Sequence, residues 1–276
     1  MNEKNKEKSL IISSTKNQRI VDTIKLRERK EREAQGRFGV EGERETLRAL
    51  KSHYHLLEIF YCQNRLSDEM EKTVSNIIKE KKTQYFEVSE NVFSKLVLRE
   101  DSGGVWSVFE SKNNDINKVD IEKFNFFLIL ENVENPGNLG AILRSADAVG
   151  VHAVVLTGEK ICDIYNPNTI RASIGTVFST PIITASAEEI ISLRREKKIQ
   201  IIGAALSKNS VSYTSINYRK PVAIMMGSES QGLSSFWLKN CDALVKIPMK
   251  GMADSLNVSS AAAVLLYEVL KQREDI

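Results

Sequence analysis

Apolar residues follow two different periods along this chain of 276 residues. From Phe124 onward, short and nearly continuous apolar runs alternate with stretches in which apolar residues recur every three or four positions. Continuous runs are typical of parallel strands covered on both faces, and the second period is typical of helices. The pattern therefore predicts an open α/β sheet, in which ligands bind beyond the carboxyl ends of the strands.

The elements of this C-terminal domain can be placed on the sequence. The predicted strands are "FFLILEN" (126–132), "HAVVLTG" (152–158), "TPIIT" (180–184), "IQIIGAAL" (199–206), "PVAIMMGS" (221–228) and "ALVKIPM" (243–249). Helices are expected at 139–149, 166–176, 187–197, 233–239 and 257–272. The last helix is apolar nearly all round between Ala261 and Leu266, which implies that it is covered on more than one side. We expect the sheet to cover one side, and the small alanines would let a second helix approach closely on another.

The N-terminal third of the chain contains shorter elements. Helices are predicted at 17–34, 43–52, 68–82 and 90–98, and strands at 37–42, 56–62, 84–89 and 104–110. The polar stretch "SKNNDINKVDIEK" (111–123) has no periodicity and is typical of a linker. We therefore expect a small α/β domain at 1–110, a linker at 111–123 and the larger domain at 124–276.

Composition excludes several classes of protein. The chain is 42% hydrophobic with a net charge of +3, and no apolar run is long enough to span a bilayer. The first residues lack the pattern of a secretory signal. Cys62, Cys162 and Cys241 show no paired spacing, and His53 and His55 have no acid or cysteine partner at metal spacing. These features predict a cytoplasmic protein without disulfides, a metal site or a membrane anchor.

Local charge is more informative than net charge. The stretch 16–37 carries eight basic residues against four acidic ones. It can be a solvated helix with ion pairs four residues apart. It can also be a surface that contacts nucleic-acid phosphates. The candidate RNA contacts in this stretch are Arg19, Lys25, Arg27, Arg29, Lys30 and Arg37.

The first predicted strand of the larger domain leads into "NPGNLGAILRSADAVG" (135–150). Its apolar residues recur at helical spacing, which marks one buried face. Arg144 lies beside that face, one turn after Gly140. Helical side chains lean toward the N-terminus, so we expect the guanidinium to pass over Gly140 and reach the loop at the end of the strand.

Polar residues also follow two other predicted strands, in "GSESQGLS" (227–234) and in "IPMKGMADSLNVSSAAAVLLYE" (247–268). Taken singly, these motifs have structural explanations, since Asn138 and Asn257 can cap helices and Gly227 and Gly232 can permit turns. Three such motifs at one edge of a sheet favour a ligand site. The order of glycines does not fit a dinucleotide fingerprint, and the chain has no P-loop, so a nicotinamide-dependent oxidoreductase is disfavoured.

Taken together, the three stretches resemble the three motifs of the SpoU/TrmH family of RNA 2′-O-ribose methyltransferases, within the SPOUT superfamily. The resemblance covers about 124–272, and "IRASIGTVFSTPI" (170–182) also fits it. The N-terminal third, with "RFGVEGERETLRAL", more loosely resembles the L30e-like substrate-binding domain of many members. The resemblance implies a parallel α/β sheet whose C-terminal part forms a trefoil knot, which general topology rules would not predict. It also implies S-adenosylmethionine as cofactor and a homodimer. Together with the apolar last helix, this places Ala262 and Leu266 at the expected dimer interface.

The resemblance assigns roles to individual residues. The positions that match the cofactor contacts are Leu206, Gly227, Ile247 and Leu256. Those that match the catalytic residues are Asn138, Arg144, Glu229, Ser255 and Asn257. In the family Arg144 would take the proton from the ribose hydroxyl, but arginine is effectively always protonated, so a grip on the neighbouring phosphate is the alternative. Asn138 would hold Arg144 or the ribose, Glu229 would orient the arginine, and Ser255 and Asn257 would bind ribose or phosphate.

These observations predict S-adenosylmethionine-dependent methylation of a ribose 2′-hydroxyl in RNA, with ribosomal RNA of the 23S type as the main expectation. One alternative is a transfer RNA substrate. Another is a non-catalytic RNA-binding assembly protein that keeps the fold, although the full set of matching polar residues argues against it.

Overall fold

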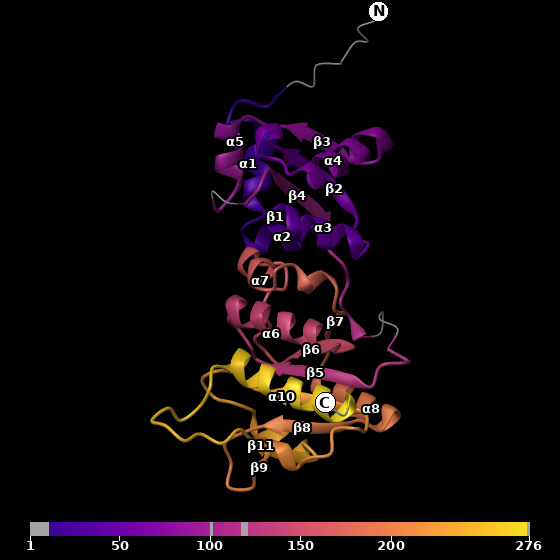
Figure 1. Cartoon of the computed structure of the whole chain (residues 1–276), viewed down its shortest axis with the longest axis vertical. Helices are drawn as coiled ribbons and strands as arrows, with labels where there is room; N and C mark the ends of the chain where they lie inside the picture. Colours follow the sequence, from indigo (N-terminus) through magenta and orange to yellow (C-terminus); the bar gives the residue numbers. More distant parts are fainter. Residues whose placement is uncertain (1–10, 100–101, 117–120, 275–276) are drawn as a thin grey trace, which may run out of the picture. The chain divides into compact units, whose positions relative to one another are not determined.

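The computed structural model describes residues 11–99, 102–116 and 121–274, and Figure 1 shows the path of the chain. Its contacts divide the chain into two compact units. The N-terminal unit consists of Met1–Lys112 with Tyr165–Pro167, and the C-terminal unit consists of Asn113–Ile164 with Asn168–Ile276. Tyr165 belongs to the N-terminal unit because its ring stacks on Phe38, with centroids 4.0 Å apart.

The N-terminal unit is a small α/β domain. Its sheet has the order β1-β4-β2-β3, in which β2 and β3 are parallel and the other pairs antiparallel. The strands are β1 (Arg37–Glu41), β2 (Leu56–Tyr61), β3 (Gln84–Glu87) and β4 (Val105–Glu110). The helices are α1 (Gln18–Lys25), α2 (Arg29–Gln35), α3 (Glu43–Lys51), α4 (Asp68–Glu80) and α5 (Glu90–Leu96), with a 3₁₀ turn η1 (Gln63–Arg65).

The single helix expected at 17–34 is in fact two helices, α1 and α2. Leu26 ends α1 and is 1% exposed, because it packs into the core of this unit. The side chain of Arg32 is also buried, and its Nη1 donates to the carbonyl oxygens of Leu26 and Arg27 at 2.7 and 2.6 Å. The carbonyls freed by the break are thus satisfied from within the same segment.

The C-terminal unit contains one sheet of parallel strands, which confirms the fold class predicted from the apolar runs. Its order is β7-β6-β5-β10-β8-β11-β9. The strands are β5 (Phe126–Glu131), β6 (Ala153–Thr157), β7 (Ile182–Thr184), β8 (Gln200–Ala204), β9 (Val211–Ser212), β10 (Val222–Met226) and β11 (Ala243–Lys246). The two-residue β9 was not predicted, because so short a strand leaves no periodic signal.

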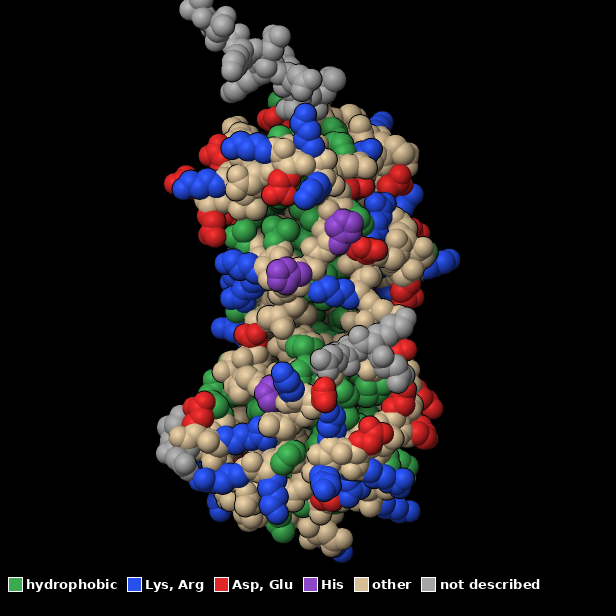
Figure 2. Space-filling model, turned by 90° about the vertical axis from the view of Figure 1, so that its right-hand side faces the viewer, with side chains coloured by type: hydrophobic (Ala, Val, Ile, Leu, Met, Phe, Trp, Pro, Cys, Tyr) green, Lys and Arg blue, Asp and Glu red, His purple; other side chains and the backbone are tan. Residues whose placement is uncertain are grey.

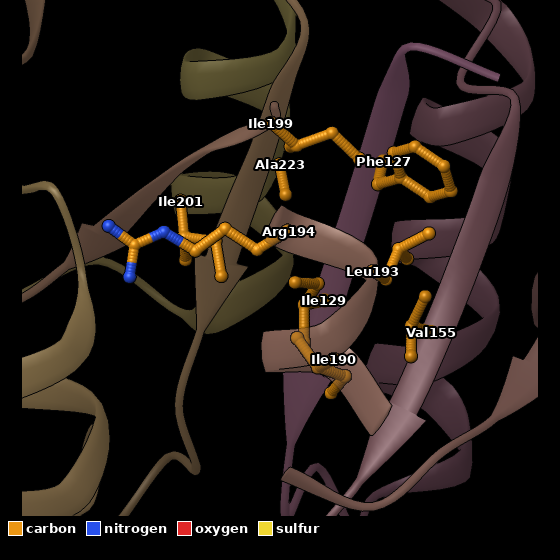
Figure 3. Close-up of a pocket in the computed structure, with 9 residues that line it drawn as sticks. All are labelled: Phe127, Ile129, Val155, Ile190, Leu193, Arg194, Ile199, Ile201 and Ala223. Atoms are coloured by element: carbon orange, nitrogen blue, oxygen red, sulfur yellow. The ribbon is translucent and has the colours of Figure 1, made fainter. Parts of the chain in front are cut away.

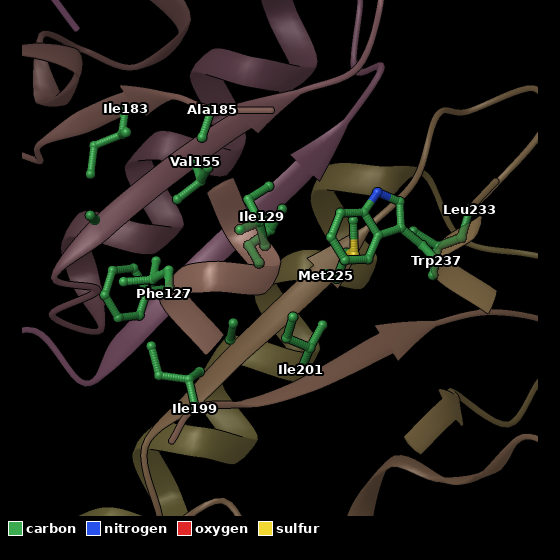
Figure 4. Close-up of a cluster of buried hydrophobic side chains, with 14 residues drawn as sticks. Phe127, Ile129, Val155, Ile183, Ala185, Ile199, Ile201, Met225, Leu233 and Trp237 are labelled. Atoms are coloured by element: carbon green, nitrogen blue, oxygen red, sulfur yellow. The ribbon is translucent and has the colours of Figure 1, made fainter. Parts of the chain in front are cut away.

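Helices cover both faces of this sheet. They are α6 (Pro136–Ala148), α7 (Pro167–Ala172), α8 (Ala187–Lys197), α9 (Ser235–Asn240) and α10 (Val258–Glu274), with 3₁₀ turns η3 (Thr176–Phe178) and η4 (Tyr213–Ser215). On one face Phe127, Ile129 and Met225 pack with residues of α8 and with Trp237 of α9 (Figure 4). On the other face α10 packs against both α6 and β10.

A narrow crevice lies within this core between the sheet and α8 (Figure 3). It holds only about 10 Å³, roughly the space of one water molecule. Its lining is apolar except for Arg194, whose guanidinium points away from the apolar residues and bonds to Asp242 and to the carbonyl oxygen of Asn240. The crevice is therefore a packing gap and not a binding site.

The helix expected at 166–176 ends earlier, at Ala172. Ile174 and Gly175 adopt the left-handed conformation, with φ of 51° and 84°, and the chain continues as η3. This turn packs against Gly140 of α6, where an added Cβ would lie 2.5 Å from the Cβ of Ala172 and 2.7 Å from the nitrogen of Ser173. Gly140 is thus needed for helix packing.

The opposite end of the sheet, where β5 begins, is held by two side chains. Arg273, near the end of α10, donates to the carbonyl oxygens of Tyr218, Lys220 and Asn125 at 3.0–3.2 Å. His152 Nδ1 accepts from the backbone nitrogens of Asn125 and Phe126 at 3.1 and 3.2 Å. Burial, together with the nearby charge of Arg273, lowers the pKa of His152.

Candidate functional site

Three of the predicted catalytic side chains form a hydrogen-bonded chain at the carboxyl edge of the C-terminal sheet. Asn138 Nδ2 donates to Glu229 Oε1 at 2.6 Å, and Asn257 Nδ2 donates to Asn138 Oδ1 at 3.1 Å. These residues come from three separate parts of the sequence, after β5, after β10 and before α10. The convergence that was expected from the strand ends is therefore present for these three side chains.

The start of α6 explains how Asn138 reaches this position. Asn135, not Asn138, is the N-cap, since its Oδ1 accepts from the nitrogens of Gly137 and Asn138 at 2.8 and 3.1 Å. Pro136 follows at the first helical position, where its missing N–H costs nothing. Because Asn135 provides the cap, the side chain of Asn138 is free to bond to Glu229 and Asn257.

Glu229 lies in a tight hairpin that follows β10. Ser228 and Gly232 exchange backbone hydrogen bonds of 3.2 and 3.0 Å, which close the turn around Glu229. A Cβ on Gly227 would lie 2.1 Å from the carbonyl carbon of Gly232. Gly227 is therefore required for closing the hairpin.

Asn257 caps α10, as its structural explanation suggested, and also takes part in the chain of side chains. Its Oδ1 accepts from the nitrogen and the Oγ of Ser259 at 2.8 and 2.6 Å. These bonds fix the amide so that Nδ2 faces Asn138. The capping interpretation and the functional one are compatible at this residue.

Arg144 does not join this chain. Its side chain is exposed, and among the described residues it has no hydrogen-bond or ion-pair partner. The expectation that it passes over Gly140 is wrong, because α7 fills the space next to that glycine. Glu229 bonds to Asn138 and not to the arginine.

A cavity of about 560 Å³ opens beside Glu229 and Asn257, within the usual size range of small-ligand sites. All four positions expected to bind cofactor line it, namely Leu206, Gly227, Ile247 and Leu256. Ser255 lines it as well, from an exposed loop.

The lining includes apolar side chains that are exposed to solvent. Leu206 is 66% exposed and Leu256 38% exposed, although both face this cavity. Lys246 and Glu229 add one charge of each sign to the wall. Exposed aliphatic surface around a cavity with both charges suits a flat apolar ring attached to a zwitterionic group.

Most of the candidate RNA contacts in the N-terminal unit have partners within the protein. Arg19 and Arg37 both lie near Glu58, at 3.5 and 3.1 Å from its Oε1. Arg27 Nη2 donates to carbonyl oxygens at the end of α5. Lys25 pairs with Asp22 at 2.8 Å, and Arg29 pairs with Glu33 at 2.7 Å. Lys30 is exposed and has no partner among the described residues.

Figure 2 shows basic and acidic side chains mixed over much of one face of the molecule. Within the part of the chain that the structure describes, no group of three or more His, Cys, Asp or Glu side chains could hold a metal ion. None of the described helices is both long and apolar enough to cross a membrane.

Sequence reasoning missed three residues that support the site. Asn135 and Ser259 orient Asn138 and Asn257, and Glu131 at the end of β5 accepts from the backbone nitrogen of Ser234 at 2.8 Å. Glu131 is only 6% exposed, although it follows an apolar strand. The sequence did carry a sign of this role, because Glu131 is an acidic residue that directly follows a buried apolar run.

Two family models match the chain. The model of the SpoU rRNA methylase family matches residues 125–267. The model of the MRM3-like substrate-binding domain matches residues 17–107. The two matches do not overlap in the sequence.

Similar proteins match over nearly their whole length. The 23S rRNA (guanosine(2553)-2′-O)-methyltransferase RlmP of Bacillus subtilis is 31% identical over 94% of this chain and 98% of its own. The 23S rRNA (uridine(2479)-2′-O)-methyltransferase of Streptomyces viridochromogenes is 28% identical over 90% of this chain and 87% of its own. The structure of the AdoMet-bound rRNA methyltransferase from Sinorhizobium meliloti matches with a TM-score of 0.84 and 30% identity, over 94% of this chain and 96% of its own. The chain belongs to the SpoU rRNA methylase family.

Proposed function

We propose that this protein transfers a methyl group from S-adenosylmethionine to a ribose 2′-hydroxyl of ribosomal RNA. One observation carries the proposal. The four expected cofactor positions line a single cavity, and the Asn138–Glu229–Asn257 chain lies at its edge. Two relatives that match at least 90% of the chain are 23S rRNA 2′-O-methyltransferases, which favours ribosomal RNA over transfer RNA.

The cavity fits S-adenosylmethionine by its chemistry. Leu206, Ile247 and Leu256 offer apolar surface for the adenine. Glu229 suits the positive charges of the ligand, and Lys246 suits its carboxylate. When bound, the cofactor supplies an activated methyl group on a sulfonium. The solved relatives from Sinorhizobium meliloti and Streptomyces viridochromogenes contain AdoMet.

The chain's own residues align the acceptor. The Asn138 amide donates one of its two hydrogens to Glu229, and its oxygen accepts a hydrogen bond from Asn257. Its second hydrogen therefore remains available for a ribose oxygen. Fixing this amide before the substrate arrives lowers the entropic cost of alignment. Ser255 and Asn257 extend the same polar surface along the cavity.

Arg144 grips the RNA phosphate beside the target ribose. Its exposure and its lack of a partner among the described residues leave its donors available for an anion. A guanidinium stays protonated in proteins, so this role requires no change in its charge. The alternative role, proton removal, would require a strongly altered environment for this exposed side chain.

Other properties belong to the same proposal. The N-terminal unit would bind RNA, with 1–110 as the substrate-binding domain and 111–123 as the linker. The C-terminal unit would be knotted, as the resemblance to the family implies. The protein would act in the cytoplasm as a homodimer.

Mapping of 2′-O-methylation across total RNA, from cells with and without the gene, tests the function. We expect the loss of methylation at a position in 23S-type rRNA, and its return when the wild-type gene is restored. If methylation is lost only in transfer RNA, the substrate is transfer RNA and not ribosomal RNA. Unchanged methylation in all RNA would refute the proposal. Calorimetry of the purified protein with S-adenosylmethionine and with NAD tests the cofactor separately.

A further inference from the structure

A second cavity, of about 410 Å³, opens at the same edge of the C-terminal sheet. It lies at the ends of β5, β6 and β7, whereas the cofactor cavity lies at the ends of β10, β8 and β11. In the sheet these two sets of strands are neighbours that meet at β5 and β10. The loop between β10 and α9 contributes to both cavities, with Glu229 on one side and Ser234 on the other.

Glu131 gives this second cavity an unusual wall. Its side chain lines the cavity yet the residue is only 6% exposed. Oε2 accepts from the nitrogen of Ser234 at 2.8 Å, while Oε1 has no hydrogen-bond partner among the described residues. Oε1 therefore keeps its capacity to accept a hydrogen bond from a ligand in the cavity. Thr157, 3% exposed, adds a hydroxyl next to it.

The cavity also has an aromatic wall. Phe236 is 42% exposed, and its ring meets Trp237 edge-on, with centroids 5.0 Å apart and planes at 87°. Trp237 itself is buried in the core beside Met225 (Figure 4). Phe236 therefore offers partly exposed aromatic surface at the cavity, and stacking on aromatic rings is how proteins hold unpaired bases of RNA.

We propose that this cavity binds the base of the target nucleotide and that the base is guanine. Guanine presents two adjacent N–H donors, N1–H and the N2 amino group, which match the two oxygens of a carboxylate. Oε2 can accept a second donor beside Ser234. Uracil presents one N–H between two carbonyl oxygens that the carboxylate repels, and the pairing edges of adenine and cytosine each offer only an amino group as donor.

This inference rests on the proposed function, because it requires the ribose of the same nucleotide to lie at Asn138. Both sites are reached from β5: Glu131 ends the strand, and Asn138 lies in the helix that follows it. The base and the ribose of one nucleotide would therefore be held by one short segment of the chain. The cofactor cavity lies on the far side of the Glu229 hairpin.

The test uses the full-length protein with S-adenosylmethionine and an RNA fragment that carries the mapped site. Two substrates are compared, with guanine or with hypoxanthine at the target, since hypoxanthine lacks only the N2 amino group. With wild-type protein we expect kcat/KM to fall about tenfold on hypoxanthine, the usual cost of losing one hydrogen bond to a charged group. Glu131→Gln should lower activity on guanine and remove the difference between the substrates.

The comparison of the two substrates separates base recognition from support of the hairpin. A purely structural role of Glu131 would lower kcat/KM on both substrates by the same factor. Glu134→Gln is the matched control, since Glu134 is an exposed carboxylate on the same loop, paired with Lys160 at 3.3 Å. It should behave as wild type. Affinity for S-adenosylmethionine should stay within about twofold in both variants, as neither residue lines the cofactor cavity.

Methylation of a uridine, cytidine or adenosine would overturn the guanine assignment while leaving the proposed function intact. The assignment would also be overturned if Glu131→Gln kept the wild-type ratio of kcat/KM between the guanine and the hypoxanthine substrate. Absence of any methylation would instead count against the proposed function.

Discussion

Gly227 shows how strictly a single residue can be required at this site. Its neighbour across the hairpin is so close that an added Cβ would lie 2.1–2.4 Å from the backbone of Gly232 and Leu233. Real Cβ atoms do not approach a backbone so closely, so the hairpin would have to open. The carboxylate of Glu229 would then move away from Asn138.

We expect Gly227→Ala to destabilise the protein by about 1–3 kcal/mol, as overpacking of a filled site does. It should also weaken binding of S-adenosylmethionine, measured by calorimetry at a temperature where the variant stays folded. Gly251→Ala is the control, because a Cβ there meets nothing within 4 Å. Equal stability and equal affinity for S-adenosylmethionine in the two variants would contradict the role given to Gly227.

Arg144 can be tested separately from the cofactor. We expect Arg144→Ala to lower methyl transfer by at least about a hundredfold, because loss of the phosphate grip would misplace the target ribose. Affinity for S-adenosylmethionine should be nearly unchanged, because Arg144 does not line that cavity. Arg144→Lys should recover part of the activity if the residue grips a phosphate, since lysine keeps the charge. A parallel loss of cofactor affinity would speak against this assignment.

His152 makes stability depend on pH. It accepts hydrogen bonds through Nδ1, and burial with the nearby Arg273 lowers its pKa in the folded protein. The unfolded chain then binds a proton more readily, so this contribution is complete above pH about 6.5 and is lost as the pH falls below that value. Urea unfolding of wild type and His152→Gln between about pH 5 and 8 should show a steeper acid decline for wild type. Identical slopes would exclude this role for His152.

At the scale of elements, the basic stretch 16–37 combines support of the fold with exposed charge. Arg27 Nη2 donates to the carbonyl oxygens of Lys95, Leu96 and Val97 at 2.9–3.2 Å and so holds the end of α5. Burial lowers the pKa of Arg27. Lys30 has no such bond.

These two residues should therefore respond differently. Arg27→Ala is expected to lower the free energy of unfolding by about 1–3 kcal/mol, since three carbonyls lose a charged donor. Lys30→Ala should leave stability within about 0.5 kcal/mol of wild type. It should weaken RNA binding, with the salt dependence reduced by about one charge. An unchanged salt slope in Lys30→Ala would show that this part of the stretch is only a solvated helix.

The main elements of the C-terminal unit could be predicted because their signals are local. Continuous apolar runs marked the longer strands, and polar motifs at three strand ends marked the site. The break at Leu26 could not be predicted, because it depends on a tertiary contact that outweighs helical periodicity. The packing of Gly140 against α7 escaped prediction for the same reason. The partners of Arg19 and Arg37 lie on another strand, at Glu58, and sequence spacing does not reveal them.

At the scale of the whole molecule, the two residues that the sequence analysis placed at a dimer interface do not lie on the surface of the chain. Ala262 and Leu266 are completely buried within one chain, so they cannot face a partner. The all-round apolarity of α10 instead reflects its packing against both α6 and β10. Ala263 and Leu270 are partly exposed and share a face with Tyr267, which is 52% exposed.

We therefore expect Tyr267→Glu to yield folded monomers, whereas Ala262→Glu should unfold the protein, because it buries an unpaired charge. Sedimentation of wild type should give about twice the chain mass of 31.1 kDa. Circular dichroism distinguishes the folded monomer from the unfolded variant. A wild-type protein that sediments as a monomer at micromolar concentration would refute the dimer, and a dimeric Tyr267→Glu would place the interface elsewhere.

The bonds of Arg273 have a consequence for synthesis of the protein. This residue, close to the end of the chain, ties α10 to the backbone where β5 and β10 begin. While the ribosome is still adding α10, β5 and its neighbours lack the last helix that covers them. The N-terminal unit needs only Tyr165–Pro167 from later in the chain and can fold during translation. The C-terminal unit completes its fold only after α10 has left the ribosome, so until then the nascent protein carries a parallel sheet without one of its covering helices.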